Sequence, residues 1–249
     1  MRKLIITASL SIILFAFSSC NIYPYLYVPS SLNMPLATNK GELKGTVSMG
    51  SGGAELQGSY CIDSHIVICI TATYGSIGST NELGNISGGY YTRFSGSGRF
   101  EIMGGGGYAT SSSRTQNSNY GGDPLVEVHC QFPEIYAQAD LGLVKKNVEL
   151  GIGLRACEIF TNGSAISETF NHGNIITENI TSLNGTALFI EPCVMISYGG
   201  KNIKVHIAAG FSGRIFGSEF PNLEVGDYGF SYSPLFGSLG LTFNLFRHI

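Results

Sequence analysis

The chain of 249 residues contains no tryptophan, and only 12% of its residues are charged. Its 14 basic residues are outnumbered by 17 acidic ones and form no cluster. Nucleic-acid binding is therefore excluded, because it needs grouped Lys and Arg to displace counterions. Beyond residue 20 no apolar run approaches the length of about 20 residues that a transmembrane helix needs. A helical membrane protein is excluded as well, and only a closed β-barrel could satisfy its own backbone in lipid.

Metal-binding and redox motifs are also missing. The six cysteines include no CxxC pair and no regular spacing, and Cys20 belongs to an N-terminal signal. The other five are an odd number, so we expect small apolar fillers on strands rather than a disulfide framework. The four glycines at 104–107 lack the Lys and the Ser or Thr that follow a phosphate loop. We predict no cofactor and no metal ion, and we favour a protein that is not an enzyme.

The chain does contain an export signal, MRKLIITASLSIILFAFSSC. Arg2 and Lys3 form a basic start, residues 4–17 form an apolar run, and two serines precede Cys20. This order is typical of a bacterial lipoprotein, which is cut before the cysteine and acylated on it. We predict a signal peptide at 1–19 and a palmitate-type lipid on Cys20. The alternatives are an ordinary secretory signal with Cys20 as a bystander, and an uncleaved helix.

Two regions follow the signal. Residues 20–41 hold three of the eight prolines without any alternation, which predicts a lipidated extended tether between the lipid and the fold. Residues 42–249 alternate apolar with polar or small side chains and predict a β-barrel domain. In NVELGIGLRAC, for example, Leu150, Ile152 and Leu154 share one face, and Glu149 and Arg155 share the other. An apolar face opposed to a small or polar face suits a barrel in lipid and is the reverse of a barrel in water.

The alternating runs number about ten, and an even number is typical of a single-chain outer-membrane barrel. The fold class is therefore all-β, an antiparallel up-and-down β-barrel of about ten strands, with eight or twelve as alternatives. Short and long connections alternate, which places both chain ends on the periplasmic side and the lipid in the inner leaflet. Pro133 and Pro192 fall inside predicted strands, where proline is expected only at bulges or strand starts. The runs lie near 42–50, 53–62, 65–75, 85–95, 98–108, 126–143, 147–159, 186–198, 202–212 and 234–246.

Short elements spread over nearly the whole mature chain form a recognisable series. They are Pro35-Leu36, Lys40-Gly41-Glu42, Leu56-Gln57, Tyr60, Ile66 to Ile68, Gly88 to Tyr91, Glu101 to Gly107, Gly151 to Arg155, Phe189 to Pro192 and Ser238 to Leu241. In these elements the chain resembles a group of small, largely uncharacterised lipoproteins of the Bacteroidota, which share a "vPlL.eKGE" stretch before a first hairpin and an "lQ.aYai...i.i" stretch in a second. The chain departs from the pattern at Ala37 and Cys61. The resemblance implies an outer-membrane barrel-like fold and carries no activity and no catalytic residues.

Charged residues of both signs fall on the polar faces of the predicted strands. A barrel of about ten strands encloses little more than its own side chains, so we expect these charges to pair across the lumen and fill it. We therefore predict little conductance. The predicted network comprises Glu42, Lys44, Glu55, Arg93, Arg99, Glu101, Asp140, Glu149, Arg155 and Lys204.

We predict a lipid-anchored, monomeric protein of the outer membrane of a Gram-negative bacterium. Its role would be structural, adhesive or partner-binding, through long outer loops at 109–125, 160–185 and 213–233 that contact an extracellular or envelope protein. One alternative is an outer-membrane hydrolase that uses Glu127, His129 and Asp123 at the rim. Another is a lipid-tethered periplasmic barrel that carries a ligand and has an apolar lining.

Overall fold

The computed structural model describes residues 25–75, 79–116, 125–171, 174–217, 223–225 and 228–246. No helix in these ranges is long and apolar enough to cross a membrane. The strands are β1 (Tyr25–Tyr27), β2 (Leu43–Gly50), β3 (Gly53–Cys61), β4 (Ile66–Gly75), β5 (Ser79–Arg93), β6 (Gly98–Gln116), β7 (Leu125–Val144), β8 (Val148–Asn171), β9 (Asn174–Gly199), β10 (Ile203–Phe211), β11 (Gly213–Gly217), β12 (Leu223–Val225), β13 (Tyr228–Tyr232) and β14 (Leu235–Phe246).

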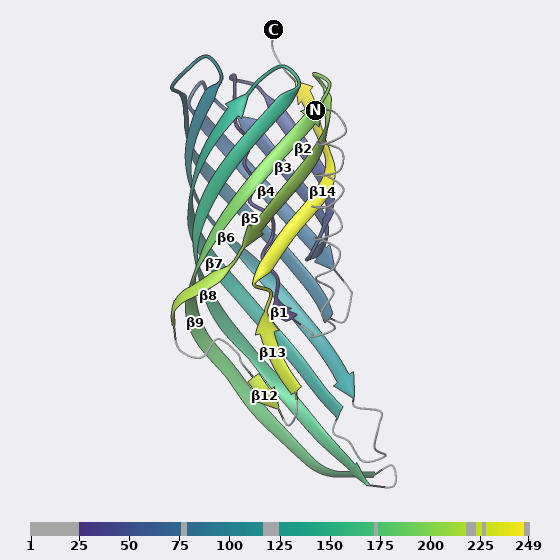
Figure 1. Cartoon of the computed structure of the whole chain (residues 1–249). Helices are drawn as coiled ribbons and strands as arrows, with labels where there is room; N and C mark the ends of the chain where they lie inside the picture. Colours follow the sequence, from purple (N-terminus) through teal and green to yellow (C-terminus); the bar gives the residue numbers. More distant parts are fainter. Residues whose placement is uncertain are drawn as a thin grey trace.

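Ten of these strands close into an antiparallel barrel (Figure 1). β2 to β10 pair in sequence order, β14 pairs with β2, and β10 pairs with both β9 and β14, which completes the cylinder. β11 is an extra strand that continues along β9. The predicted fold class and the strand number of ten are confirmed.

The two ends of the barrel differ. At the tight-turn end, residues 62–65, 94–97, 145–147 and 200–202 join neighbouring strands, and β2 begins and β14 ends there. At the opposite, long-strand end the wall is uneven (Figure 1). β2, β3, β4, β10 and β14 have 8 to 12 residues and stop early. β6 to β9 have 19 to 26 residues and project beyond them.

This projection corrects the predicted long loops. Much of the 109–125 loop is strand, because β6 continues to Gln116 and pairs with β7 throughout. The 160–185 loop is a hairpin of β8 and β9 that remains paired to Asn171 and Asn174. The 213–233 loop contains β11, β12 and β13. The Ser, Thr, Asn and Gly residues of these segments are typical of loops, but the long ladders of β6 with β7 and of β8 with β9 override local propensity.

Both unexpected prolines lie where the sheet requires no ladder donor. The pairing of β7 with β8 is interrupted between Gln131 and Glu134, and Pro133 occupies this gap. Pro192 of β9 faces the break between β10 and β11. Because proline lacks a backbone N–H, these interruptions remove the cost that a paired position would impose.

The two faces of β7 exchange character near Pro133. On the tight-turn side of Pro133 the outward residues are apolar and exposed, as at Ile135 and Leu141, and the inward residues Gln138 and Asp140 are buried. On the long-strand side the outward residues are Gln131, His129 and Glu127, and the inward residues are Phe132, Cys130, Val128 and Val126. The barrel therefore has a polar interior on the tight-turn side of Pro133 and an apolar core on the long-strand side.

The N-terminal segment corrects the predicted tether, because it runs inside the barrel. We call residues 25–41 the N-terminal plug. Near its start Tyr27 packs edge-on against Phe132 and at a tilt against Phe189, with ring centroids 5.9 Å apart in each pair, in the apolar core of the long-strand end. Near its end Ala37 contacts Glu101, which lies close to the first residue of β6 at the tight-turn end. The plug is thus extended, as predicted, but it crosses the lumen from end to end.

Candidate functional site

Inward-facing glycines on β7 and β8 leave room in the lumen for the plug. Leu32, Leu36 and Met34 of the plug are 0 to 5% exposed. A Cβ atom placed on Gly153 would lie 2.9 Å from the sulfur of Met34 and 3.0 Å from Leu32, so a larger side chain has no room there. Gly142 and Gly151 face the plug in the same way. Along this stretch of β7 and β8 the small inward residues thus provide the space that the plug fills.

Lumenal carboxylates accept hydrogen bonds from backbone N–H groups of the plug. Glu101 is completely buried and accepts hydrogen bonds from the N–H groups of Leu36 and Ala37, at 3.1 and 2.6 Å. Glu55 accepts one from the N–H of Ser31 at 3.1 Å. A segment without regular secondary structure must find partners for its buried N–H groups elsewhere. In this barrel the wall supplies them.

The carbonyl groups of the plug are satisfied by donors from the wall. Lys44 donates to the carbonyl of Pro35 at 2.6 Å, and Gln138 donates to that of Asn33 at 3.0 Å. Gln57 donates to the carbonyl of Ser31 at 3.0 Å, and Arg155 to that of Ser30 at 3.1 Å. The wall therefore binds the plug mainly through its main chain, on both the donor and the acceptor side.

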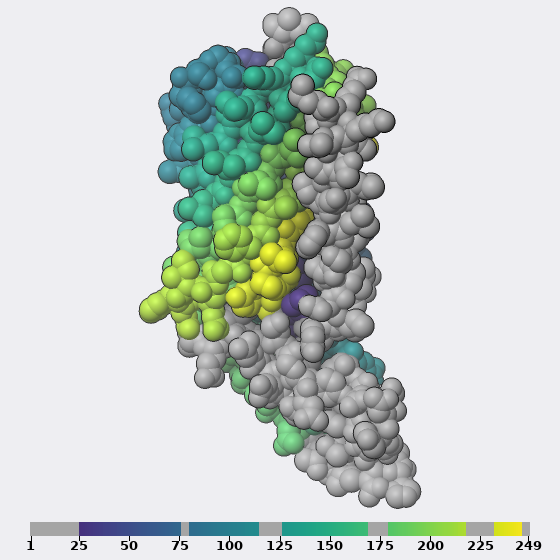
Figure 2. Space-filling view, in the orientation of Figure 1, coloured from purple at the N-terminus to yellow at the C-terminus, as the bar shows by residue number. Residues whose placement is uncertain are grey.

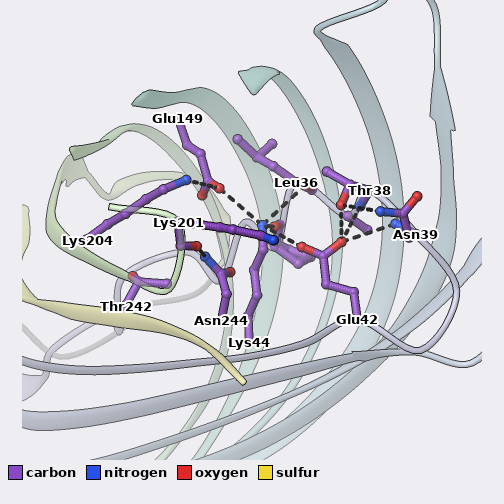
Figure 3. A network of polar contacts seen from close by, with 12 residues as sticks. Leu36, Thr38, Asn39, Glu42, Lys44, Glu149, Lys201, Lys204, Thr242 and Asn244 are labelled. Carbon is purple, nitrogen blue, oxygen red and sulfur yellow. Dashed lines mark hydrogen bonds and ion pairs between the residues drawn. The ribbon is translucent and has the colours of Figure 1, made fainter. Parts of the chain in front are cut away.

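A chain of charges lies at the tight-turn end of the lumen (Figure 3). Glu42 approaches Lys44 at 3.4 Å, Lys44 approaches Glu149 at 3.5 Å, and Glu149 binds Lys204 at 2.5 Å. Glu42 also accepts hydrogen bonds from Thr38, including one from its N–H at 2.7 Å. These four charged groups alternate in sign, so each buried charge has a compensating neighbour.

Glu42 precedes the first barrel strand, and its pKa is shifted by opposing effects. Burial alone would raise this pKa, but the neighbouring Lys44 and the hydrogen bonds from Thr38 and Asn39 together lower it. A carboxyl group whose pKa is lower in the folded state stabilises the fold when it is ionised. This contribution is present above the unfolded-state pKa and is lost as the pH falls through the folded-state pKa.

A second charged layer separates the polar lumen from the apolar core. Arg155 donates to Glu191 at 2.5 Å, and both side chains are almost fully buried. Glu134 of β7 accepts a hydrogen bond from the hydroxyl of Tyr27 at 3.3 Å. The Arg155 guanidinium also lies 5.5 Å from the ring centre of Tyr136.

The structure brings most of the predicted charges together in the lumen but not all of them. Arg93 is exposed at the tight-turn end, where it donates to Asn39 at 2.7 Å, so its predicted place in the lumen is wrong. Arg99 is buried and donates to the carbonyl of Gly98. Asp140 accepts from Gln138 at 2.9 Å. Within the described ranges the buried charged residues are Glu42, Lys44, Glu55, Arg99, Glu101, Glu134, Asp140, Glu149, Arg155, Glu191 and Lys204.

The prediction missed Glu134 and Glu191, and with them an excess of acids over bases. Among the described residues, four buried acids have no basic side chain within 4 Å: Glu55, Glu101, Glu134 and Asp140. Three of them accept hydrogen bonds from the plug, and Asp140 binds the amide of Gln138, which also holds the plug. The charges therefore do not simply pair across the lumen as predicted, because the excess acids bind the plug.

Little space is left between the plug and the wall. A cavity of about 20 Å³, room for a single water molecule, is lined by Lys44, Thr46, Ser197, His206 and plug residues. Ser197 and His206 are hydrogen-bonded to each other at 3.1 Å, a pair that the sequence analysis did not single out. Both side chains are buried behind the plug, so no substrate reaches them in this structure.

The rim residues considered for a hydrolase lie on the outer face of β7. His129 is exposed, and Glu127 is paired at 3.0 Å with Arg114, which is itself mostly exposed. Asp123 lies outside the described residues. Ser112 of β6 and Ser164 of β8 are the cross-strand neighbours of His129. Among the described residues, however, no hydrogen bond joins either hydroxyl to the imidazole, and Glu127 is engaged with Arg114, so no catalytic group is assembled there.

The five cysteines within the described ranges are free and buried. In the same ranges no group of three or more His, Cys, Asp or Glu side chains could hold a metal ion. A comparison with protein-family models gave no match, and a comparison with curated proteins gave none. The function must therefore be argued from the geometry of the barrel and its plug.

Proposed function

We propose that the protein is a closed outer-membrane barrel whose lumen is sealed by its own N-terminal plug and whose projecting strands form a binding surface outside the membrane. The observation that carries this proposal is the plug itself, held by wall residues along its main chain. A barrel built for bulk transport needs a free lumen, whereas here the plug occupies it and the cavity between the plug and Lys44, Ser197 and His206 holds about one water molecule.

The outer surface supports a membrane location. Exposed aromatic side chains gather near both ends of the apolar wall, as the girdles of outer-membrane barrels do. Near the tight-turn end they are Tyr60, Tyr90, Phe94 and Tyr198, and toward the long-strand end they are Tyr74, Tyr108, Phe160 and Phe211. Leu150, Ile152 and Leu154 lie exposed between them on β8. A water-soluble carrier barrel would place such residues inside, so this alternative is disfavoured.

The height of the apolar wall also fits a membrane. On β9 the outward positions are apolar over ten residue steps, from Leu188 to Tyr198. At roughly 3.3 Å per residue and a tilt of about 40°, this spans about 25 Å along the barrel axis, the height of the apolar band in outer-membrane barrels.

The projecting part of β6 to β9 supports a binding role. Beyond the apolar wall its outward side chains are polar, as at Gln131, Asn162 and Ser182, and its inward side chains form an apolar core. A sheet of this kind is stable in water without contributing to a membrane span. We assign the surface that faces a protein partner to this projection, and the short turns to the periplasmic side.

Purified wild-type protein is expected to give little conductance in planar lipid bilayers. The physical reason is that the plug occupies the lumen and its main-chain groups are bound to the wall. Single-channel recording checks this, with a known porin as the positive control for insertion. A large and steady open channel from the wild-type protein would overturn the sealed-barrel proposal.

Ile152→Arg is expected to destabilise the protein in phospholipid vesicles by about 2–4 kcal/mol, because an arginine would face the hydrocarbon near the middle of the apolar wall. Asn162→Arg is the matched control, since residue 162 is ten positions further on the same outward face of β8 but in the polar projection. We expect its effect to stay within about 0.5 kcal/mol. Denaturant unfolding from vesicles measures both variants, and equal losses would contradict the membrane boundary.

A further inference from the structure

The direction of the plug determines which end of the barrel the N-terminus can reach. Tyr25 pairs with Ser231 of β13, and Tyr27 packs in the apolar core at the long-strand end. The chain then passes through the lumen and enters β2 at the tight-turn end. The space-filling view shows the purple N-terminal segment reaching the surface beside the yellow C-terminal strands (Figure 2).

Chain length prevents Cys20 from returning to the tight-turn end. Val144 marks that end on β7 and lies twelve residues beyond Phe132, the partner of Tyr27. At about 3.3 Å per residue and a tilt near 40°, this separation is about 30 Å along the axis. Cys20 is five residues before Tyr25, and five extended residues reach at most about 18 Å.

We propose that the lipid on Cys20 sits in the membrane leaflet at the long-strand end, so that the N-terminus threads through the barrel from that side. This inference rests on the proposed membrane barrel and replaces the expectation of a lipid in the inner leaflet on the periplasmic side. The binding projection and the acyl anchor then share one side, which is the cell surface.

The barrel wall is short on the side formed by β14, β2 and β3, which allows an acyl anchor at the N-terminus to reach the bilayer. β14, β2 and β3 end early at the long-strand end, and the turn after Gly50 is short. Tyr74 at the end of β4 belongs to the aromatic girdle, so the wall on this side stops at the edge of the apolar band. The chain before Tyr25 would leave the lumen beside the short strands β14, β2 and β3. The acyl chains on Cys20 would then enter the leaflet next to these strands.

Labelling of single engineered cysteines in cells that make the full chain tests this placement. Asn21→Cys reports the N-terminus, Ile180→Cys reports the projection, where Ile180 is 69% exposed, and Lys146→Cys reports the tight-turn end. Native thiols give little background because they are buried, and burial raises the pKa of the Cys130 thiol to about 11. The reagent is a membrane-impermeant maleimide, applied before and after permeabilisation of the outer membrane.

We expect Asn21→Cys and Ile180→Cys to be labelled at least tenfold more than Lys146→Cys in intact cells, and Lys146→Cys to reach their level after permeabilisation. If Asn21→Cys instead follows Lys146→Cys while Ile180→Cys is labelled in intact cells, the threading inference fails and the proposed function stands. If Asn21→Cys and Ile180→Cys are both protected and Lys146→Cys is labelled, the shared side holds and the cell-surface location fails.

Discussion

Arg155→Met is expected to destabilise the barrel by about 3–5 kcal/mol, the cost of leaving a buried charge without its partner. Arg155 is the basic partner of Glu191 at 2.5 Å, and both side chains are almost fully buried. The same guanidinium binds the carbonyl of Ser30 in the plug at 3.1 Å, so the substitution also leaves a plug acceptor unpaired. The loss should therefore exceed that of a substitution at an exposed position.

The double variant Arg155→Met with Glu191→Met separates charge from packing. Replacing a buried ion pair by apolar residues of similar size is often close to neutral, so the double variant should regain most of the stability lost in Arg155→Met. Glu191→Met alone leaves Arg155 compensated only by the more distant charge of Glu134, so its stability should lie between those of Arg155→Met and the double variant. Denaturant unfolding of the three variants in vesicles measures the coupling, and a double variant as unstable as Arg155→Met would refute the ion-pair argument.

The barrel wall and most of its lumenal charges could be predicted from the sequence, and the plug inside it could not. Strand number and facing follow from the alternation of residues such as Leu150, Glu149 and Ile152, because one face had to meet an apolar surrounding and the other a crowded lumen. Glu191 has the parity of the other inward residues of β9. The alternation within the predicted strand at 186–198 is therefore the signal that places it in the lumen.

The plug was missed because a segment without periodicity has the same pattern whether it lies in water or in a lumen. Its composition does carry a signal, since Leu26, Leu32 and Leu36 are too apolar for a solvated tether. The projecting strands were missed for a different reason. Their alternation is inverted relative to the membrane wall, with small polar residues outside, and Ser, Thr and Asn runs are typical of loops.

Glu101→Ala is expected to free the plug. The side chain is completely buried and accepts the N–H groups of Leu36 and Ala37, so its removal leaves two buried donors unpaired. Each costs about 1–3 kcal/mol, or about 2–6 kcal/mol for both. No other carboxylate holds this part of the plug within the described residues, apart from Glu42 at Thr38 and Asn39.

Two measurements distinguish a released plug from a weakened barrel. Chymotrypsin should cut Glu101→Ala within residues 25–41, where Leu32 and Leu36 are shielded in the wild-type protein, and should leave the paired strands intact. Planar bilayers should then show brief openings that the wild-type protein lacks.

Ile102→Ala is the matched control, since Ile102 is the next residue of β6, faces outward and is 52% exposed. Glu101→Gln keeps an acceptor oxygen and should release the plug less often. A plug that stays protected and a pore that stays closed in Glu101→Ala would show that this carboxylate does not hold the seal.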